Sequence, residues 1–302
     1  MKKFLLKLAL FSVIISIIIL YILNKYSGYV DYFYGKVSSP AQTSLIIGDS
    51  RSLQGIQPSV IDSALSKKYE LPILNFSFTV KQMSYGDAWI KTIKKKVRPE
   101  TKNGLFILSV HPWVLSEREE DDVLNGKFYE EKMPPNNLHF VNTNPNIEYF
   151  FKNYEYFHFK SMIKKISIVH EDGWLEENST ATSDSATLRG WENIQINLYT
   201  KFSKKWKKSI FRVKKLSETI DFLKQHGKVV LVRMPVSKEI FDLELSYWRD
   251  FNQEITKLAK DKSVEYYDFS LSDDFGFYDG VHLNKKNGKK FTSILCDSIS
   301  KY

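Results

Sequence analysis

A short polar sequence, Gly48–Arg51, directly follows the apolar run Leu45–Ile47. This order is typical of a buried parallel strand that ends at the carboxyl edge of its sheet and turns into a helix. At such a corner the Ser50 hydroxyl would be exposed, and its backbone N–H would be an unpaired donor of the helix start. These two groups suit a nucleophile that attacks an acyl carbon and stabilises the oxyanion that forms. The alternative is that Asp49 or Ser50 simply caps the helix.

A second polar pair, Asp279 and His282, lies between the last expected strand and the last expected helix. In a turn or at a helix start, this spacing brings a carboxylate beside an imidazole. The carboxylate can hold one ring nitrogen as N–H, which leaves the other nitrogen free to accept a proton from a serine. The alternative is a surface turn with a capping aspartate and a hydrogen-bonded histidine.

Strands and helices alternate along most of the chain, and their order decides whether these residues meet. Because active sites lie beyond the carboxyl ends of parallel strands, we expect Ser50, Asn75, Ser77 and His111 to converge on one rim. Apolar runs bounded by turn residues predict strands at Thr43–Ile47, Leu71–Phe76, Gly104–Val110, Lys228–Arg233 and Val264–Phe269. Amphipathic stretches predict helices at Pro58–Leu65, Tyr85–Lys96, Gln195–Gln225, Leu245–Lys260 and from Asn284 towards Ile299. Such alternation indicates a parallel sheet with helices on both faces.

The alternation is interrupted between about 116 and 190. This region contains acidic stretches, paired prolines at Pro134–Pro135 and a Ser/Thr-rich run, Asn178–Thr187. Within it, Ile147–Tyr156 and Phe159–Ile168 have helical patterns. We therefore expect an insertion at about 116–190 that is partly loop and could form a lid over the rim.

The N-terminus carries an apolar segment, Phe4–Leu23, with a single lysine inside it. The segment is long enough to cross a hydrocarbon core of about 30 Å. Bulky residues stand where a signal peptidase needs small ones, so an uncleaved membrane anchor at 1–26 is expected rather than a cleaved signal. The preceding lysines favour a cytoplasmic N-terminus and an extracytoplasmic main domain, in the periplasm or at the cell surface. The alternative is a main domain in the cytoplasm. Residues 27–42 are expected to form a tether, and 43–302 the main domain.

The composition limits the chemistry further. The chain has 302 residues, 43% hydrophobic and 26% charged, which is typical of a folded protein. The single cysteine, Cys296, excludes an internal disulfide and a cysteine-based zinc site, and no metal or organic cofactor is expected. The net charge of +9 suits an anionic lipid surface or an acidic glycopolymer. The lysines between Lys201 and Lys215 predict a solvated helix face or, alternatively, such an anionic contact. Nucleic acid is not an expected partner.

Together, the Gly-Asp-Ser sequence after the first strand and the Asp-x-x-His sequence before the last helix resemble the SGNH (GDSL-type) hydrolase superfamily. The resemblance implies that Ser50 is the nucleophile, that His282 is the general base and then acid, and that Asp279 orients His282. It also implies an α/β fold, a three-layer sandwich around a parallel flavodoxin-like sheet of about five strands, here with an N-terminal transmembrane helix. It covers about 43–110 and 228–302 but not the middle of the chain.

Two sequence blocks depart from the family pattern. The family offers a glycine N–H to the oxyanion in its second block, whereas Asn75–Thr79 contains no glycine. The third block offers an asparagine, whereas the third strand here ends in Ser-Val-His-Pro-Trp. Asn75, a backbone N–H of Ser77 or Phe78, and His111 are therefore candidate oxyanion or substrate-binding groups, with a packed structural role as the alternative for His111. Loss of one oxyanion donor slows catalysis by about 10²–10³-fold.

The layout also resembles membrane-tethered SGNH-like proteins of the cell envelope. This resemblance implies an esterase or O-acyltransferase that acts on an ester, expected to be an acyl group of an envelope glycan. The expected partners are the bilayer through the N-terminal helix, the glycan or acyl-ester substrate, and a membrane protein that donates acyl groups. The competing prediction is a catalytically inactive, SGNH-shaped protein that binds a glycan or a partner protein, and the missing glycine and asparagine favour it.

Overall fold

The computed structural model describes residues 1–26, 31–155, 168–177, 184–272 and 274–301. Its centre is a parallel sheet with the strand order β2-β1-β3-β8-β9. This is the doubly wound, flavodoxin-like order, so the predicted α/β class and the predicted set of strands are confirmed. The five strands are β1 (Ser44–Ile47), β2 (Ile73–Asn75), β3 (Gly104–Ser109), β8 (Gly227–Arg233) and β9 (Glu265–Asp268).

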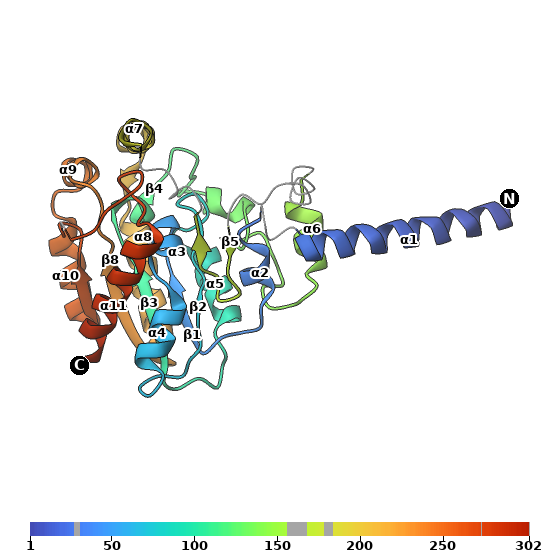
Figure 1. Cartoon of the computed structure of the whole chain (residues 1–302), viewed down its shortest axis with the longest axis horizontal. Coiled ribbons are helices and arrows are strands. Elements are labelled where there is room, and N and C mark those ends of the chain that lie inside the picture. Colours follow the sequence, from blue (N-terminus) through green and yellow to red (C-terminus); the bar gives the residue numbers. More distant parts are fainter. Residues whose placement is uncertain (27–30, 156–167, 178–183, 273, 302) are drawn as a thin grey trace.

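The inner strands are apolar on both sides because helices cover both faces of the sheet. Phe106 and Leu108 of β3 face one core cluster, whereas Leu105 and Ile107 face the other. The first cluster contains side chains of α5 (Asp87–Lys96), α8 (Ile210–Leu223) and α10 (Phe251–Lys262). The second contains side chains of α4 (Pro58–Leu65) and α11 (Lys285–Ser300), which cover the face of the sheet turned towards the viewer in Figure 1.

Two predicted helices are each divided into two, which corrects the sequence prediction. The segment expected as Gln195–Gln225 forms α7 (Ser185–Lys205) and α8, and the segment expected as Leu245–Lys260 forms α9 (Lys238–Tyr247) and α10. Between α7 and α8, β7 (Lys207–Lys208) pairs with β4 (Ser116–Glu117), and the Ser209 hydroxyl caps α8. The apolar pattern continues across both breaks because Trp206 and Trp248 are buried there. The periodicity of apolar residues alone therefore does not reveal the two breaks.

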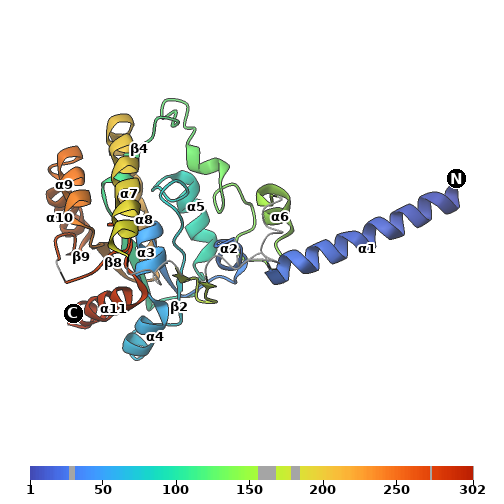
Figure 2. The ribbon, with the colours of Figure 1, turned by 45° about the horizontal axis from the view of Figure 1, so that its top comes forward.

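Helix α1 (Lys2–Tyr26) projects from the globular body (Figures 1 and 2). Its residues Lys2–Ile22 are long and apolar enough to cross a membrane by length and composition, and none of them is buried. Residues 27–30 of the expected tether lie outside the described part of the chain. The rest of it is packed rather than free, because α2 (Tyr34–Ser38) buries Val37 and Lys36. The Lys36 ammonium donates to the carbonyl oxygens of Ser77 at 3.0 Å and Gly173 at 2.8 Å.

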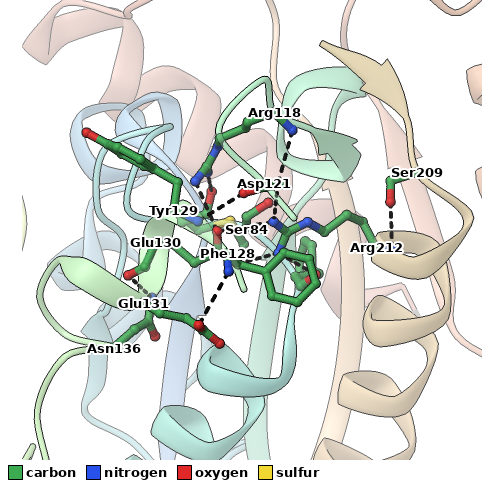
Figure 3. A network of polar contacts seen from close by, with 12 residues as sticks. Ser84, Arg118, Asp121, Phe128, Tyr129, Glu130, Glu131, Asn136, Ser209 and Arg212 are labelled. Carbon is green, nitrogen blue, oxygen red and sulfur yellow. Dashed lines mark hydrogen bonds and ion pairs between the residues drawn. The ribbon is translucent and has the colours of Figure 1, made fainter. Parts of the chain in front are cut away.

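The described part of the insertion has few helices and strands, and buried ion pairs fix it to the sheet domain. Arg118 Nη1 lies 3.1 Å from Glu130 Oε2, and Arg212 of α8 binds both Glu130 and Asp121 (Figure 3). All four side chains of this network are buried at the pairing atoms, so their charges are compensated within the protein. The short helix η2 (Pro112–Leu115) directly precedes the insertion. The described elements of the insertion are β4 at its start, η3 (Tyr129–Lys132), α6 (Ile147–Asn153), β5 (Ile168–Val169), β6 (Leu175–Glu176) and the first residues of α7. Of the expected helix Phe159–Ile168, residues 159–167 lie outside the described part, and Ile168 begins β5.

Removal of a core side chain from the central strand tests this packing. Ile107 is fully buried, so we expect Ile107→Ala to lower the free energy of unfolding by about 2–5 kcal/mol through lost burial and a cavity. Leu245 on α9 is 44% exposed, and Leu245→Ala is expected to change it by less than about 0.5 kcal/mol. Urea unfolding of the full chain in detergent, followed by tryptophan fluorescence, measures both values. Equal losses in the two variants would contradict the core position of Ile107.

Candidate active site

The end of β1 and the loop before α11 meet, although they are 232 residues apart. The Ser50 hydroxyl oxygen lies 2.8 Å from Nε2 of His282, and Nδ1 of His282 lies 2.7 Å from Oδ2 of Asp279. Because an ionised carboxylate only accepts, His282 carries its proton on Nδ1 and leaves Nε2 to accept from the serine. The structure thus brings together the three residues that the two sequence motifs singled out. Within the described part of the chain, no group of three or more His, Cys, Asp and Glu side chains could hold a metal ion.

Ser50 occupies the first position of the short helix α3 (Ser50–Gly55). Asp49 caps this helix, since its Oδ1 accepts a hydrogen bond from the Arg51 N–H at 3.1 Å. The capping role therefore belongs to Asp49, which leaves the half-buried Ser50 hydroxyl for His282. A Cβ atom at Gly48 would collide with the side chains of Ser52 and Ser109, so only glycine fits this turn. As the first helical residue, Ser50 also presents an N–H without an intrahelical acceptor.

The Asp279 carboxylate is fixed by its own loop. Its Oδ1 accepts from the N–H groups of Val281 at 3.0 Å and His282 at 2.8 Å. Gly280, between Asp279 and Val281, has a φ of +79°, a conformation that L side chains rarely adopt. Burial raises the pKa of Asp279, but its interaction with His282 and these backbone hydrogen bonds outweigh burial and lower that pKa below its usual value. Asp279 therefore stays ionised beside the imidazole.

Two further contacts to the triad were not found from the sequence. Gln195 Nε2 of α7 donates to Asp279 Oδ2 at 3.0 Å, the same oxygen that faces His282. The Tyr278 ring stacks on the His282 ring with centroids 5.7 Å apart, and the Tyr278 hydroxyl donates to Gln54 Oε1 at 2.6 Å. Tyr278 adjoins Asp279 in the sequence and could have been suspected. Nothing in the sequence around Gln195 indicates this contact, because its position depends on how α7 crosses the rim of the sheet.

The side chains predicted to bind the oxyanion or the substrate are buried in the protein rather than exposed beside Ser50. Asn75, Ser77 and His111 are all 0% exposed. Asn75 Nδ2 donates to the carbonyl oxygens of Ser52 at 2.9 Å and Ile56 at 3.0 Å, so it holds the C-terminal end of α3. The structure therefore buries these residues, where they support neighbouring segments. This differs from the sequence prediction that they bind the oxyanion or the substrate.

The backbone N–H groups considered for the oxyanion are also engaged within the protein. The Ser77 N–H donates to Asn75 Oδ1 at 3.2 Å, and the Phe78 N–H donates to the Gly48 carbonyl at 3.0 Å. Since each N–H already has an acceptor, neither is free to receive a substrate oxygen. The Ser50 N–H is the predicted oxyanion donor that stays available.

His111 stabilises Asp49, the residue before Ser50. Its Nε2–H donates to Asp49 Oδ2 at 2.9 Å, and both side chains are fully buried. Burial and the nearby Arg51 lower the pKa of His111, which therefore stays neutral. Burial raises the pKa of Asp49, but His111 and Arg51 outweigh it and lower that pKa to about 2. The packed structural reading of His111 is the one that fits this geometry.

Close to Ser50, the Glu244 side chain of α9 is held between two arginines. Arg51 Nη2 lies 2.7 Å from Glu244 Oε1, and Arg233 Nη2 lies 2.8 Å from Glu244 Oε2. The Trp113 indole N–H also donates to Oε1 at 3.0 Å. Burial raises the pKa of Glu244, but the two arginines outweigh it and lower that pKa to about 2. The ion pairs connect α3, β8 and α9 under the site.

Comparisons with known proteins find only distant structural similarity. No family model matches the sequence, and no curated protein matches it. Est24, a carbohydrate acetylesterase from Sinorhizobium meliloti, is 9% identical, with 85% of this chain and 98% of that chain covered and a TM-score of 0.40. A lipase/acylhydrolase from Enterococcus faecalis is 10% identical, with coverages of 85% and 95% and a TM-score of 0.40. The native aryl esterase of M. smegmatis is 10% identical, with coverages of 86% and 99% and a TM-score of 0.40. At this level of similarity, the assignment of chemistry rests on the geometry of the site.

The pH dependence of stability tests the buried carboxylate. Folding lowers the pKa of Glu244 from its usual 4.5 to about 2, so the unfolded chain binds this proton first as the pH falls. The stability from the ionised group is complete above pH 4.5 and is lost as the pH falls from 4.5 towards 2. We expect Glu244 to account for roughly 3 kcal/mol of that loss.

The matched variant is Glu244→Gln, which keeps the shape but not the charge. We expect it to be less stable at neutral pH by about 3–5 kcal/mol, because two buried arginines lose their partner. As the pH falls, the free energy of unfolding of Glu244→Gln should also decrease less steeply than that of the unaltered protein. Urea unfolding of both proteins between about pH 6 and about pH 3 measures the slopes. Equal slopes would show that folding does not lower the pKa of Glu244.

Proposed function

We propose that this protein is a membrane-anchored serine esterase or O-acyltransferase. Its substrate is an ester in which an acyl group is attached to an envelope glycan. The observation that carries the proposal is the hydrogen-bonded line from the Ser50 hydroxyl through His282 to Asp279. This order of alcohol, imidazole and carboxylate is the arrangement that activates a serine for nucleophilic attack. The proposed reaction needs no group beyond the substrate and water or an acceptor alcohol.

In the first half of the proposed reaction, Ser50 Oγ attacks the acyl carbonyl carbon while Nε2 of His282 takes the hydroxyl proton. Asp279 stabilises the imidazolium that forms, and Gln195 and the loop N–H groups keep the carboxylate in place. The Ser50 N–H donates to the carbonyl oxygen as it becomes an oxyanion. His282 then gives its proton to the alcohol oxygen as the bond between that oxygen and the acyl carbon breaks. The acyl group remains on Ser50.

In the second half, His282 takes a proton from water or from a sugar hydroxyl as that oxygen attacks the acyl-serine carbon. The bond to Ser50 Oγ then breaks, and His282 returns the proton to Oγ, which restores Ser50. Water gives hydrolysis and a sugar hydroxyl gives acyl transfer, so the same residues serve both outcomes. The apolar helix α1 supports an envelope location, since Lys2–Ile22 can cross a membrane. We infer that the N-terminus is cytoplasmic and the sheet domain extracytoplasmic, because lysines precede the apolar segment. The net charge of +9 suits an acidic glycan.

The second candidate is a catalytically inactive protein that binds a glycan or a partner protein. The observation that favours it is the scarcity of oxyanion donors, because the Ser77 and Phe78 N–H groups are both used within the protein. With one donor missing, an enzyme would work about 10²–10³-fold more slowly. A slow esterase and an inactive binding protein are separated by the reactivity of Ser50.

We expect Ser50→Ala to abolish labelling by a fluorophosphonate probe and to lower kcat on an acetylated test ester by about 10⁴–10⁶-fold, because the nucleophile is removed. Mass spectrometry of the labelled peptide locates the modified serine. The matched control is Ser63→Ala, since Ser63 is exposed on α4 and bonds to the Ser59 carbonyl. Absence of labelling at Ser50 in the unaltered protein would favour the binding protein. Unchanged ester hydrolysis in Ser50→Ala would exclude the mechanism.

Gln195 is expected to be a positioning residue for Asp279. Its removal in Gln195→Ala takes one donor from the carboxylate, and we expect kcat to fall by about 10-fold with little change in KM. The acidic limb of the pH–rate profile should shift with it, whereas a purely structural effect would leave that limb in place. Asn197→Ala, an exposed residue on the same helix, serves as the control. A profile of Gln195→Ala identical to that of the control would count against this role.

A further inference from the structure

Helix α6 exposes an apolar surface that the proposed chemistry does not use. Its members are Phe140, which precedes the helix and is 59% exposed, Ile147, which is 45% exposed, and Phe151, which is 87% exposed. We call these three residues the α6 face. Ile147 and Phe151 are four residues apart and so lie on one side of the helix, while Tyr149 and Phe150 are buried in the core. Neighbouring exposed aromatic and aliphatic side chains commonly mark a contact surface.

The α6 face lies where α1 leaves the globular body. Leu20, near the end of α1, packs against the core cluster that contains Tyr149 and Phe150. Both views show α6 beside the inner end of α1, at the edge of the body from which α1 projects (Figures 1 and 2). If α1 crosses a bilayer, the surface of that bilayer lies at about the level of α6.

The chemistry around the α6 face also suits a lipid surface. Aromatic side chains favour the boundary between headgroups and acyl chains, where an apolar ring meets a polar environment. A cavity of about 520 Å³ lies next to α6. Its lining includes the apolar Met133 and Pro134 and charged side chains of both signs, Lys132, Lys152, Asp31 and Glu155. Lys152 also pairs with Glu148 at 2.7 Å, so the exposed apolar side chains rather than a net positive charge are what favour the membrane interface.

We propose that the α6 face lies in the headgroup layer of the membrane that α1 crosses, as a second point of attachment for the sheet domain. This inference rests on the membrane anchoring in the proposed function but not on the catalytic role of Ser50. One helix alone would let the domain turn relative to the bilayer. Two points of attachment fix its orientation, so the rim that carries Ser50 keeps a constant height and direction above the lipid.

Bromolipid quenching of a site-specific dye tests the proposal. The full chain is reconstituted into vesicles of phosphatidylethanolamine and phosphatidylglycerol with bromine near the headgroup end of the acyl chains. Phe151→Cys carries an environment-sensitive dye, and the native Cys296 is buried and should not react. We expect brominated lipid to cause a loss of fluorescence at position 151. The matched control is Leu245→Cys, because Leu245 is 44% exposed and belongs to α9, a helix at the opposite edge of the body in both views. Its fluorescence should not change.

The possible outcomes separate this inference from the anchoring. A protein that floats with the vesicles but shows no quenching at position 151 would overturn the membrane contact of α6 and leave the anchor intact. A protein that does not float with the vesicles would overturn the anchoring itself. Disulfide-linked dimers of unlabelled Phe151→Cys, formed in vesicles in place of quenching, would assign the α6 face to a second copy of the chain and would also overturn the proposal.

Discussion

The geometry of the site depends on one buried carboxylate, that of Glu244. It bridges Arg51, which follows Ser50 directly, and Arg233, which ends β8. Buried charges destabilise a fold unless they are compensated. Here the positive charges of Arg51 and Arg233 are matched by the ionised Glu244 and Asp49, and the neutral His111 adds no further charge. The charge balance of this cluster fixes α3 against β8 and α9, and so fixes the backbone that carries Ser50.

The two sides of Ser50 are built from different parts of the chain. The supporting side consists of buried groups from the sheet framework, in which Asn75 holds the end of α3 and His111 holds Asp49. The other side is formed by the insertion and by α7. The Trp174 indole N–H of the insertion donates to the Gln54 carbonyl at 2.8 Å, and Gln195 of α7 donates to Asp279. A rigid support beneath a nucleophile and variable segments around it is how one fold accepts different substrates.

The framework and the triad could be predicted because their signals are local. Apolar runs that end at Gly48 and Arg233 are typical of buried parallel strands, and a doubly wound sheet brings the residues after such strands to one edge. The support could not be predicted, since Asn75 and His111 look the same in sequence whether they face substrate or the protein interior. The division of the long helix at Trp206 was missed because a buried tryptophan continues the apolar pattern. Gln195 was missed because its contact depends on tertiary placement alone.

The polar groups around Ser50 weigh against a purely binding role. A module that only binds glycan gains nothing in stability from a nine-tenths buried imidazole and an ionised Asp279 that is 4% exposed, since apolar residues would fill the same space more favourably. In addition, Asp279 receives two backbone N–H groups, the Gln195 amide and the His282 ring N–H. That number of donors keeps a carboxylate ionised and immobile beside an imidazole that accepts from a serine. Such an arrangement has a physical use when the imidazole must carry a positive charge for a moment, which is what acyl transfer to Ser50 requires.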